Sequence, residues 1–177
     1  MKRARLLALL AVATTALCAA PSVQARTPCP GEQTAPTALN VAQVSDAVFC
    51  LSNQIRAHYG LPALRRDARL DKAAALHSLV MGVRNFFDHT NPDGLDPTQR
   101  AAAQGYPLGV GENIAYGYAN ARAVVLGWMA STGHCRNLLS SAADFGAGTA
   151  VVGTPHYTQA FGDYFTQTVD LAARNAC

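Results

Sequence analysis

The hydrophobic pattern of this chain changes its period along the sequence, and this change limits the folds open to it. Apolar residues first recur at the three- and four-residue spacings of a helix, at Val44, Val48, Leu51 and Ile55. The last third instead holds the short β-branched and aromatic segments GAGTAVVG, HYTQAFG and YFTQTVD, separated by Gly, Pro and Asp. Helices followed by strands predict an α+β domain with an antiparallel sheet.

Three further helices are predicted from residues that favour helix N-termini. Asp67 precedes ARLDKAAALHSLVMGVRNFF, Asp96 stands before a proline, and Asn120 precedes ARAVVLGWMAS. We expect the pair Thr132-Gly133 to end the last of these helices. In the first of them His77 shares one helical face with apolar residues, so we interpret it as a core histidine and not as a ligand.

The segment 1–25 has the pattern of a cleaved secretory signal. It reads MKRARLLALLAVATTALCAAPSVQA, with a basic start, a short apolar stretch and a small-residue end, so we expect cleavage after Ala25. The apolar stretch is too short for a stable membrane span. The sequence therefore predicts an extended Pro-rich arm over 26–43 and one domain over 44–177, secreted to the extracellular space or the periplasm.

The basic character of the whole chain comes from this leader. It contains three of the 14 Lys and Arg residues and none of the 11 Asp and Glu residues, so 11 residues of each sign remain after cleavage. A nucleic-acid-binding surface needs an excess of positive charge. We therefore expect no nucleic-acid partner, and we expect a monomer.

Four cysteines follow the leader: Cys29, Cys50, Cys135 and Cys177. An even number in an exported chain predicts two disulfides, for which three pairings are possible. We favour Cys29–Cys50, which would join the arm to the first helix, and Cys135–Cys177, which would join the C-terminus to the middle of the domain. No two of these cysteines are two to four residues apart, which disfavours a zinc site built from them.

The common catalytic signatures do not occur in this sequence. Ser131 lies three residues before His134, but the segment offers no oxyanion device, and we interpret the serine as a hydrogen-bonding residue at a helix end. What remains are polar groups at the edges of predicted elements: His89, Glu112, His134 and His156. Two histidines and a glutamate would suit a divalent metal, or they could hydrogen-bond among themselves.

Five ordered segments resemble the signatures of the CAP superfamily, which comprises cysteine-rich secretory proteins, antigen 5 and pathogenesis-related 1 proteins and is also called the SCP domain. They are CLSNQIRAHYGLPALRRDARLDKAAALHS, NFFDHTNPDG, GENIAYG, WMASTGHCRNLL and HYTQAFG. The resemblance covers about residues 29–162 and assigns 44–177 to a CAP domain. It implies an α–β–α sandwich in which a three-stranded antiparallel sheet lies between helical layers.

The resemblance also implies a central cleft with two histidines and two glutamates, which binds zinc or another divalent ion in some members. His89, Glu112 and His156 match the first histidine, the first glutamate and the second histidine. Ser131 stands where other branches have the second glutamate, and His134 could fill part of that place. No cofactor is required on this view. If YFTQTVD were the terminal strand in place of HYTQAFG, His156 would lie in a loop.

Two roles for Glu112 stay open at this point. It could line the cleft and be held ionised by neighbouring imidazoles, while the amide of Asn113 secures the local turn. Alternatively, the Glu112 carboxylate could accept hydrogen bonds from backbone amides and only brace a loop.

The resemblance favours a binding or interaction module for a small apolar ligand, such as a lipid or sterol, or for another extracellular partner. Trp128, Tyr116 and Tyr118 are the candidate apolar contacts. The first alternative is a metal-assisted hydrolase, in which His89, Glu112 and His156 hold the metal and Glu112 or His134 moves protons. The second is a structural module of the cell envelope.

Overall fold

The computed structural model describes residues 26–162 and 176–177. The secretory signal over 1–25 and the segment YFTQTVD lie outside the described residues, so both remain sequence predictions. Within the described part of the chain, no helix combines the length and the apolar character needed to cross a membrane.

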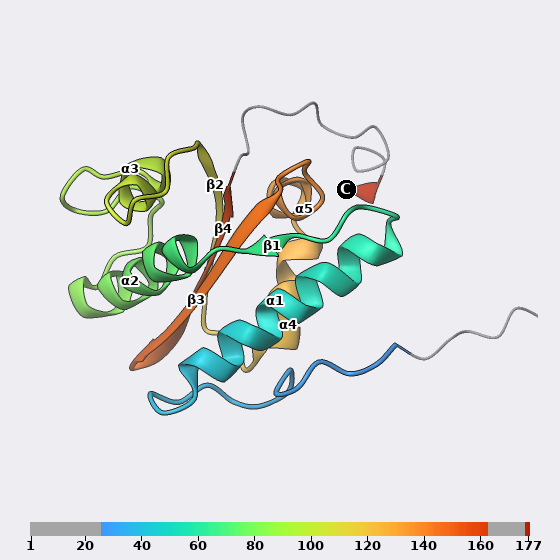
Figure 1. Cartoon of the computed structure of the whole chain (residues 1–177). Helices are drawn as coiled ribbons and strands as arrows, with labels where there is room; N and C mark the ends of the chain where they lie inside the picture. Colours follow the sequence, from blue (N-terminus) through green and yellow to red (C-terminus); the bar gives the residue numbers. More distant parts are fainter. Residues whose placement is uncertain (1–25, 163–175) are drawn as a thin grey trace, which may run out of the picture.

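The described chain forms helices and strands in a mixed order (Figure 1). The helices are α1 (Val41–His58), α2 (Ala68–Arg84), α3 (Pro97–Ala102), α4 (Ala121–Met129) and α5 (Thr132–Leu138). The strands are β1 (Arg65–Arg66), β2 (Val110–Tyr116), β3 (Asp144–Val152) and β4 (Thr154–Gly162).

The predicted helix N-termini are confirmed by their hydrogen bonds. The side chains of Asp67 and Asn120 accept from backbone amides at the starts of α2 and α4, and Asp96 forms a capping box with Gln99 in α3. The expectation for Thr132-Gly133 is wrong. The backbone turns to an extended conformation at Ser131, and a new helix, α5, begins directly after it.

The sheet has four strands in the order β1-β3-β4-β2, which corrects the expected three-stranded antiparallel sheet. Strand β4 pairs antiparallel with both β2 and β3, whereas β1 pairs parallel with β3. Sequence reasoning missed β1 because two consecutive arginines show no alternation of apolar and polar residues. It also placed Glu112 at the edge of an element, whereas Glu112 lies inside β2.

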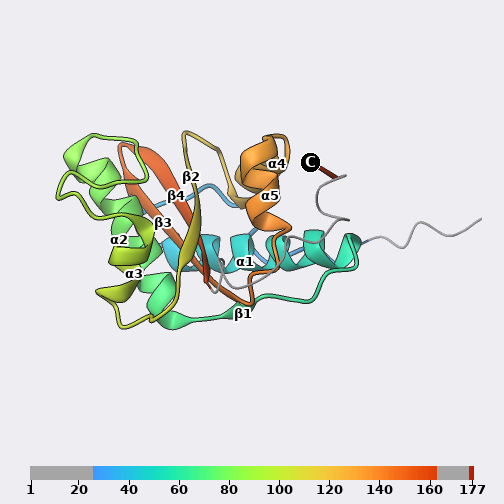
Figure 2. The same cartoon turned by 90° about the horizontal axis from the view of Figure 1, so that it is seen from above.

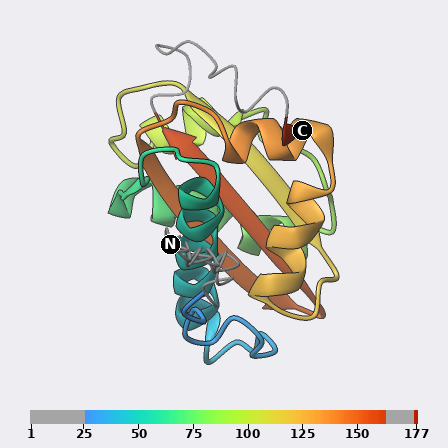
Figure 3. The same ribbon diagram turned by 90° about the vertical axis from the view of Figure 1, so that its right-hand side faces the viewer.

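Helices cover both faces of the sheet. Figure 2 shows α2 and α3 on one side and α1, α4 and α5 on the other, and Figure 3 looks onto the second group. The main apolar core lies on the α1 and α4 side and includes Trp128, Phe145 and Phe161. On the opposite face α2 approaches β3 very closely, because a Cβ atom at Gly148 would lie 2.1 Å from the backbone nitrogen of Ala75.

Both disulfides join the expected cysteines. Cys29 is bonded to Cys50 in α1, and Cys135 in α5 is bonded to Cys177. The C-terminal residue therefore lies beside α5, as Figure 1 shows, and its carbonyl oxygen accepts a hydrogen bond from the Thr132 hydroxyl. The first disulfide attaches the N-terminal arm to α1.

Candidate functional site

The carboxylate of Glu112 is enclosed by charged groups from two other segments. Its side chain is 3 % exposed. One oxygen, Oε1, accepts a hydrogen bond from His89 Nδ1 at 2.9 Å, and the other, Oε2, accepts from the Arg100 guanidinium at 2.5 Å. Neither oxygen accepts a backbone amide in the described residues, so the geometry matches a carboxylate held by an imidazole and does not match a loop brace.

Arg100 is the partner that sequence reasoning did not identify. It lies in α3, its side chain is buried, and its guanidinium also donates to the carbonyl oxygens of His89 and Leu95. These bonds fix the loop that carries His89 against β2. An arginine in a short polar helix is usually solvated, so its sequence position gave no signal of burial.

The buried imidazole of His77 in α2 also lies close to the Glu112 carboxylate. Its Nε2 donates to the Asp88 carbonyl oxygen at 3.0 Å and lies 3.8 Å from Glu112 Oε1. Burial lowers the pKa of His77, so the ring is neutral at pH 7, and its unprotonated Nδ1 has no hydrogen-bond partner among the described residues. The interpretation of His77 as a core histidine fits its burial.

His156 lies apart from His89 and Glu112. In the β2–β4 register Glu112 is opposite Ala160 and His156 is opposite Tyr116, a separation of four residues or roughly 13 Å along the strand. The His156 ring stacks on Tyr116, and its Nδ1 donates to the Thr154 carbonyl oxygen. The expected group of His89, Glu112 and His156 is therefore not assembled in this structure.

Ser131 immediately precedes α5, and His134 lies in the first turn of this helix. The Ser131 side chain makes no capping hydrogen bond, so nothing in the described contacts gives it the role of the second glutamate. Burial, together with the charge of His89, lowers the pKa of His134. The backbone carbonyl of His134 accepts a hydrogen bond from the Asn113 amide.

Asn113 belongs to a buried chain of polar side chains and does not secure a local turn. Its amide also donates to Gln159 Oε1 at 3.1 Å and its oxygen accepts from Asn137 at 2.8 Å. The Gln159 amide in turn donates to Ser52 in α1 at 2.9 Å. These bonds connect α5, β2, β4 and α1 across one face of the sheet. Asn113 thereby fixes the strand that also carries Glu112.

This donor set does not fit a divalent metal. Over residues 26–162 and 176–177, no group of three or more His, Cys, Asp or Glu side chains is placed to hold an ion. Both oxygens of Glu112 already accept from basic side chains, and the fixed charge of Arg100 would repel a cation there. The contacts of Glu112 in this structure are those of a carboxylate held by basic side chains.

A groove between α1 and α4 has a volume of about 670 Å³. Its lining is mainly apolar and includes Leu51, Ile55, Val125, Leu126 and Met129. Leu126 is 53 % exposed, so one wall of the groove is open to solvent. Apolar side chains that converge on an open cavity are typical of sites for apolar ligands.

Two arginines lie at the rim of the groove and share one carboxylate. Glu32 accepts hydrogen bonds from Arg26 at 2.7 and 2.9 Å and from Arg122 at 3.3 Å. The bonds from Arg26 lower the pKa of Glu32, so Glu32 is ionised at pH 7. Two positive charges against one negative charge leave this rim with a net charge of +1.

The three aromatic residues that the sequence suggested as apolar contacts do not line this groove. Trp128 is buried and donates its indole N–H to the Ile114 carbonyl oxygen, so it is a core residue. Tyr118 packs against the same core. Tyr116 is exposed, on the opposite face of the sheet from the groove.

The stability of the domain is expected to depend on pH through His89. The hydrogen bond to Glu112 raises the pKa of His89 above its ordinary value of about 6.5. A raised pKa means that the contribution of this pair is complete below about pH 6.5 and is lost as the pH rises through the folded-state pKa. We expect the difference in melting temperature between the wild type and His89→Gln to shrink as the pH is raised from about 6. A difference that stays constant or grows would contradict the assignment.

Comparisons with known proteins agree with this architecture. The profile described as "CAP: Cysteine-rich secretory protein family" matches residues 51–169. The Bacillus subtilis protein YkwD, which is described as uncharacterised, is 35 % identical over 102 residues, which are 57 % of this chain and 40 % of YkwD. The uncharacterised B. subtilis membrane protein YlbC is 36 % identical over 120 residues, 64 % of this chain and 33 % of YlbC. The chain thus spans two fifths or less of these relatives.

Comparison with solved structures also finds proteins of similar fold. An extracellular SCP-domain protein from Bacillus anthracis has a TM-score of 0.59 and 33 % identity over 70 % of this chain and 40 % of that chain. An outer surface protein from Borrelia burgdorferi has a TM-score of 0.63 and covers 69 % of this chain and 93 % of that chain. Its 22 % identity supports the fold alone.

Proposed function

Because the chain belongs to the cysteine-rich secretory protein (CAP) family, we propose that it is an exported binding module that holds the apolar tail of an anionic lipid between α1 and α4. The observation that carries this proposal is the groove of about 670 Å³, with apolar walls and a rim of net positive charge. Its two disulfides support an oxidising location such as the extracellular space or the periplasm.

The walls of the groove supply the attraction for an apolar tail. Each methylene group removed from water contributes about 0.8 kcal/mol, before the cost of immobilising the ligand is subtracted. The volume lies within the usual range for small-molecule sites. Leu126 and Met129 lie on α4 and Leu51 and Ile55 on α1, so a tail between the helices would contact both.

The rim supplies the preference for an anionic head group. Arg122 is the weaker partner of Glu32, at 3.3 Å, and its side chain is 42 % exposed. A carboxylate or phosphate at the mouth of the groove could accept hydrogen bonds from Arg122 without breaking the closer Arg26–Glu32 pair. A fatty acid combines this head group with an apolar tail.

Laurate binding to the chain without the segment 1–25 tests this proposal by titration calorimetry. We expect Leu126→Glu to weaken laurate binding by at least about tenfold, because it places a charge where the tail would lie. Leu79→Glu is the matched control, since Leu79 is similarly exposed on α2, on the other face of the sheet. Equal laurate affinity for Leu126→Glu and the wild type would rule out the groove as the site.

A second comparison separates the head group from the tail. Arg122→Ala should weaken the binding of laurate more than that of dodecanol, which has the same tail length without the carboxylate. If both ligands lose affinity equally, the rim has no part in recognition.

A further inference from the structure

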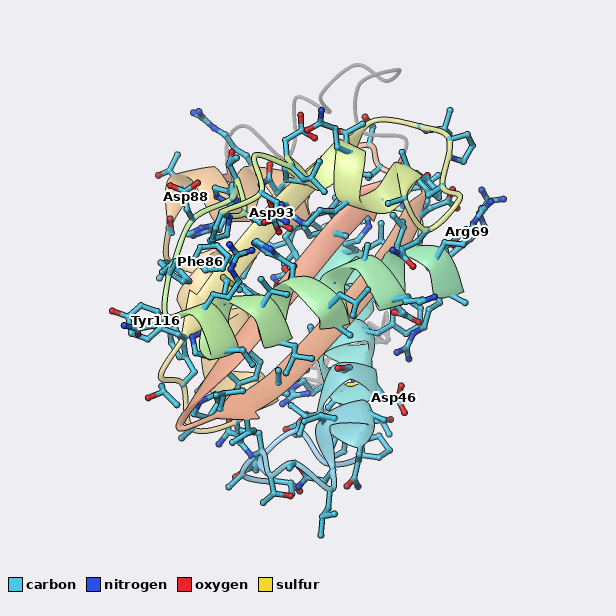
Figure 4. All side chains as sticks on the ribbon, turned by 90° about the vertical axis from the view of Figure 1, so that its left-hand side faces the viewer. Asp46, Arg69, Phe86, Asp88, Asp93 and Tyr116 are labelled. Carbon is cyan, nitrogen blue, oxygen red and sulfur yellow. A yellow bond between two sulfur atoms is a disulfide. The ribbon has the colours of Figure 1, made fainter. Side chains whose placement is uncertain are left out.

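A second cavity, of about 320 Å³, lies at the C-terminal end of α2 against the β3–β4 turn. Its lining includes Asn85, Phe87, Tyr116, Thr154 and His156. Figure 4 looks onto this face of the molecule and labels Phe86 and Tyr116, which both line the cavity near the end of α2. We propose that this cavity, here called the aromatic cavity, binds an uncharged saccharide.

Three adjacent rings form the wall of the aromatic cavity. The centroids of Phe87 and Tyr116 are 4.8 Å apart at an interplanar angle of 66°, and those of Tyr116 and His156 are 6.1 Å apart at 24°. Phe87 is 46 % exposed and Tyr116 is 56 % exposed. Ring surface left in water is a source of binding free energy for a ligand with a flat apolar face. The C–H face of a pyranose ring has this shape and polarity.

The polar side chains of the aromatic cavity are a carboxamide, a hydroxyl and an imidazole. Asn85 ends α2 in a left-handed conformation, with φ of 50°, and contributes a carboxamide to the cavity lining. Thr154 contributes a hydroxyl. Because His156 Nδ1 donates to the Thr154 carbonyl oxygen, the neutral ring has Nε2 as a hydrogen-bond acceptor. These donors and acceptors suit the hydroxyl groups at the edge of a sugar ring.

The composition of the lining argues against other ligand classes. It contains no Asp, Glu, Lys or Arg among the described residues, so neither a cation nor an anion would find an opposite charge. An acyl chain would cover the amide and hydroxyl without replacing their hydrogen bonds to water, which costs free energy. A saccharide satisfies both the rings and the polar groups.

The back of the aromatic cavity depends on a glycine in α2. A Cβ atom at Gly82 would lie 2.7 Å from Val152 Cβ and 3.4 Å from His156 Nδ1. The missing side chain lets the β3–β4 turn pack against the helix and brings His156 beside Tyr116. The position of the rings is thus fixed by packed elements.

The test measures binding of chitotetraose, cellotetraose and maltotetraose by amide chemical-shift titration of the chain without the segment 1–25. We expect at least one of these neutral tetrasaccharides to bind with a Kd at or below roughly 1 mM. The shifts should centre on Asn85, Phe87, Tyr116 and Thr154. No binding by any of the three up to roughly 10 mM would overturn the proposal.

Variants of Tyr116 test whether the saccharide stacks on the aromatic ring. A variant of Leu126 tests whether it binds in the aromatic cavity and not in the groove between α1 and α4. Tyr116→Ala should weaken tetrasaccharide binding by at least about tenfold, whereas Tyr116→Phe keeps the ring and should retain most of the affinity. Leu126→Glu should leave tetrasaccharide binding unchanged while it weakens laurate binding. Tetrasaccharide binding that survives Tyr116→Ala, or that disappears in Leu126→Glu, would place the saccharide elsewhere, whatever the outcome for laurate.

Discussion

Replacing Arg100 with methionine is expected to lower the free energy of unfolding by about 3–5 kcal/mol. The substitution keeps much of the side-chain volume but removes the only positive charge that bonds Glu112 Oε2 among the described residues. The Glu112 carboxylate would stay buried, and its Oε2 would have lost the positive charge that compensates its own. The carbonyl oxygens of His89 and Leu95 would lose the same donor, so the loop that carries His89 should loosen as well.

Urea unfolding at pH 7 measures this loss. The matched control is the double variant Arg100→Met/Glu112→Leu, in which neither charge remains. Because a buried ion pair replaced by apolar residues is often neutral in stability, the double variant should recover most of what the single variant loses. A loss below about 1 kcal/mol in Arg100→Met would mean that the pair behaves as a surface ion pair, contrary to its burial.

Removing the disulfide between Cys135 and Cys177 is expected to have an effect of similar size. The two residues are 42 positions apart, and closing a loop of this length stabilises a fold by about 4 kcal/mol through the entropy of the unfolded chain. The double variant Cys135→Ala/Cys177→Ala leaves no free thiol from this pair. Cys135 is buried, so alanine also avoids placing a polar group in the core.

Guanidinium unfolding measures the free energy of unfolding of Cys135→Ala/Cys177→Ala, and the same measurement on Cys29→Ala/Cys50→Ala provides the comparison. The second pair is 21 positions apart, so its loss should cost less, about 3 kcal/mol. Non-reducing peptide mapping checks the bonds themselves. A peptide in which Cys50 is joined to Cys135 would contradict both assignments, as would a loss below about 1 kcal/mol in each double variant.

Local signals in the sequence predicted the starts of α2, α3 and α4 but missed α5. Asp67, Asp96 and Asn120 bind backbone amides within their own first turn, so the cause of each helix start lies within a few residues. The strands depend on distant partners. Strand β1 exists because its backbone pairs with β3. Four helices and strand β2 lie between the two strands in the sequence, and the two arginines of β1 favour no particular structure.

The candidate site was predictable only in part. The resemblance identified Glu112 and His89, which the structure brings to 2.9 Å. It did not identify Arg100, because a buried and a solvated arginine have the same sequence signature. It also grouped His156 with Glu112, although the strand register separates them by four residues. A motif match gives the order of residue types along the chain. The pairing register of β2 and β4 determines which of these residues are neighbours in space.

The groove between α1 and α4 could not be predicted for a related reason. Leu51 and Ile55 belong to the apolar stripe that indicated a core-facing helix, yet both also line the groove. Periodicity shows which face of a helix is apolar, but not whether a neighbouring helix covers that face completely. Here α4 covers the apolar face of α1 only in part, so a groove remains between the two helices and Leu126 of α4 is exposed.

Methyl chemical shifts on addition of laurate report directly on whether the groove holds a lipid tail. If the groove holds the lipid tail, the methyl groups of Ile55, Val125, Leu126 and Met129 should shift together with a single Kd. The methyl groups of Leu79 and Val83, on exposed positions of α2, should not move. Shifts confined to the α2 methyl groups, or no saturable shift at all, would mean that the groove does not bind the lipid tail.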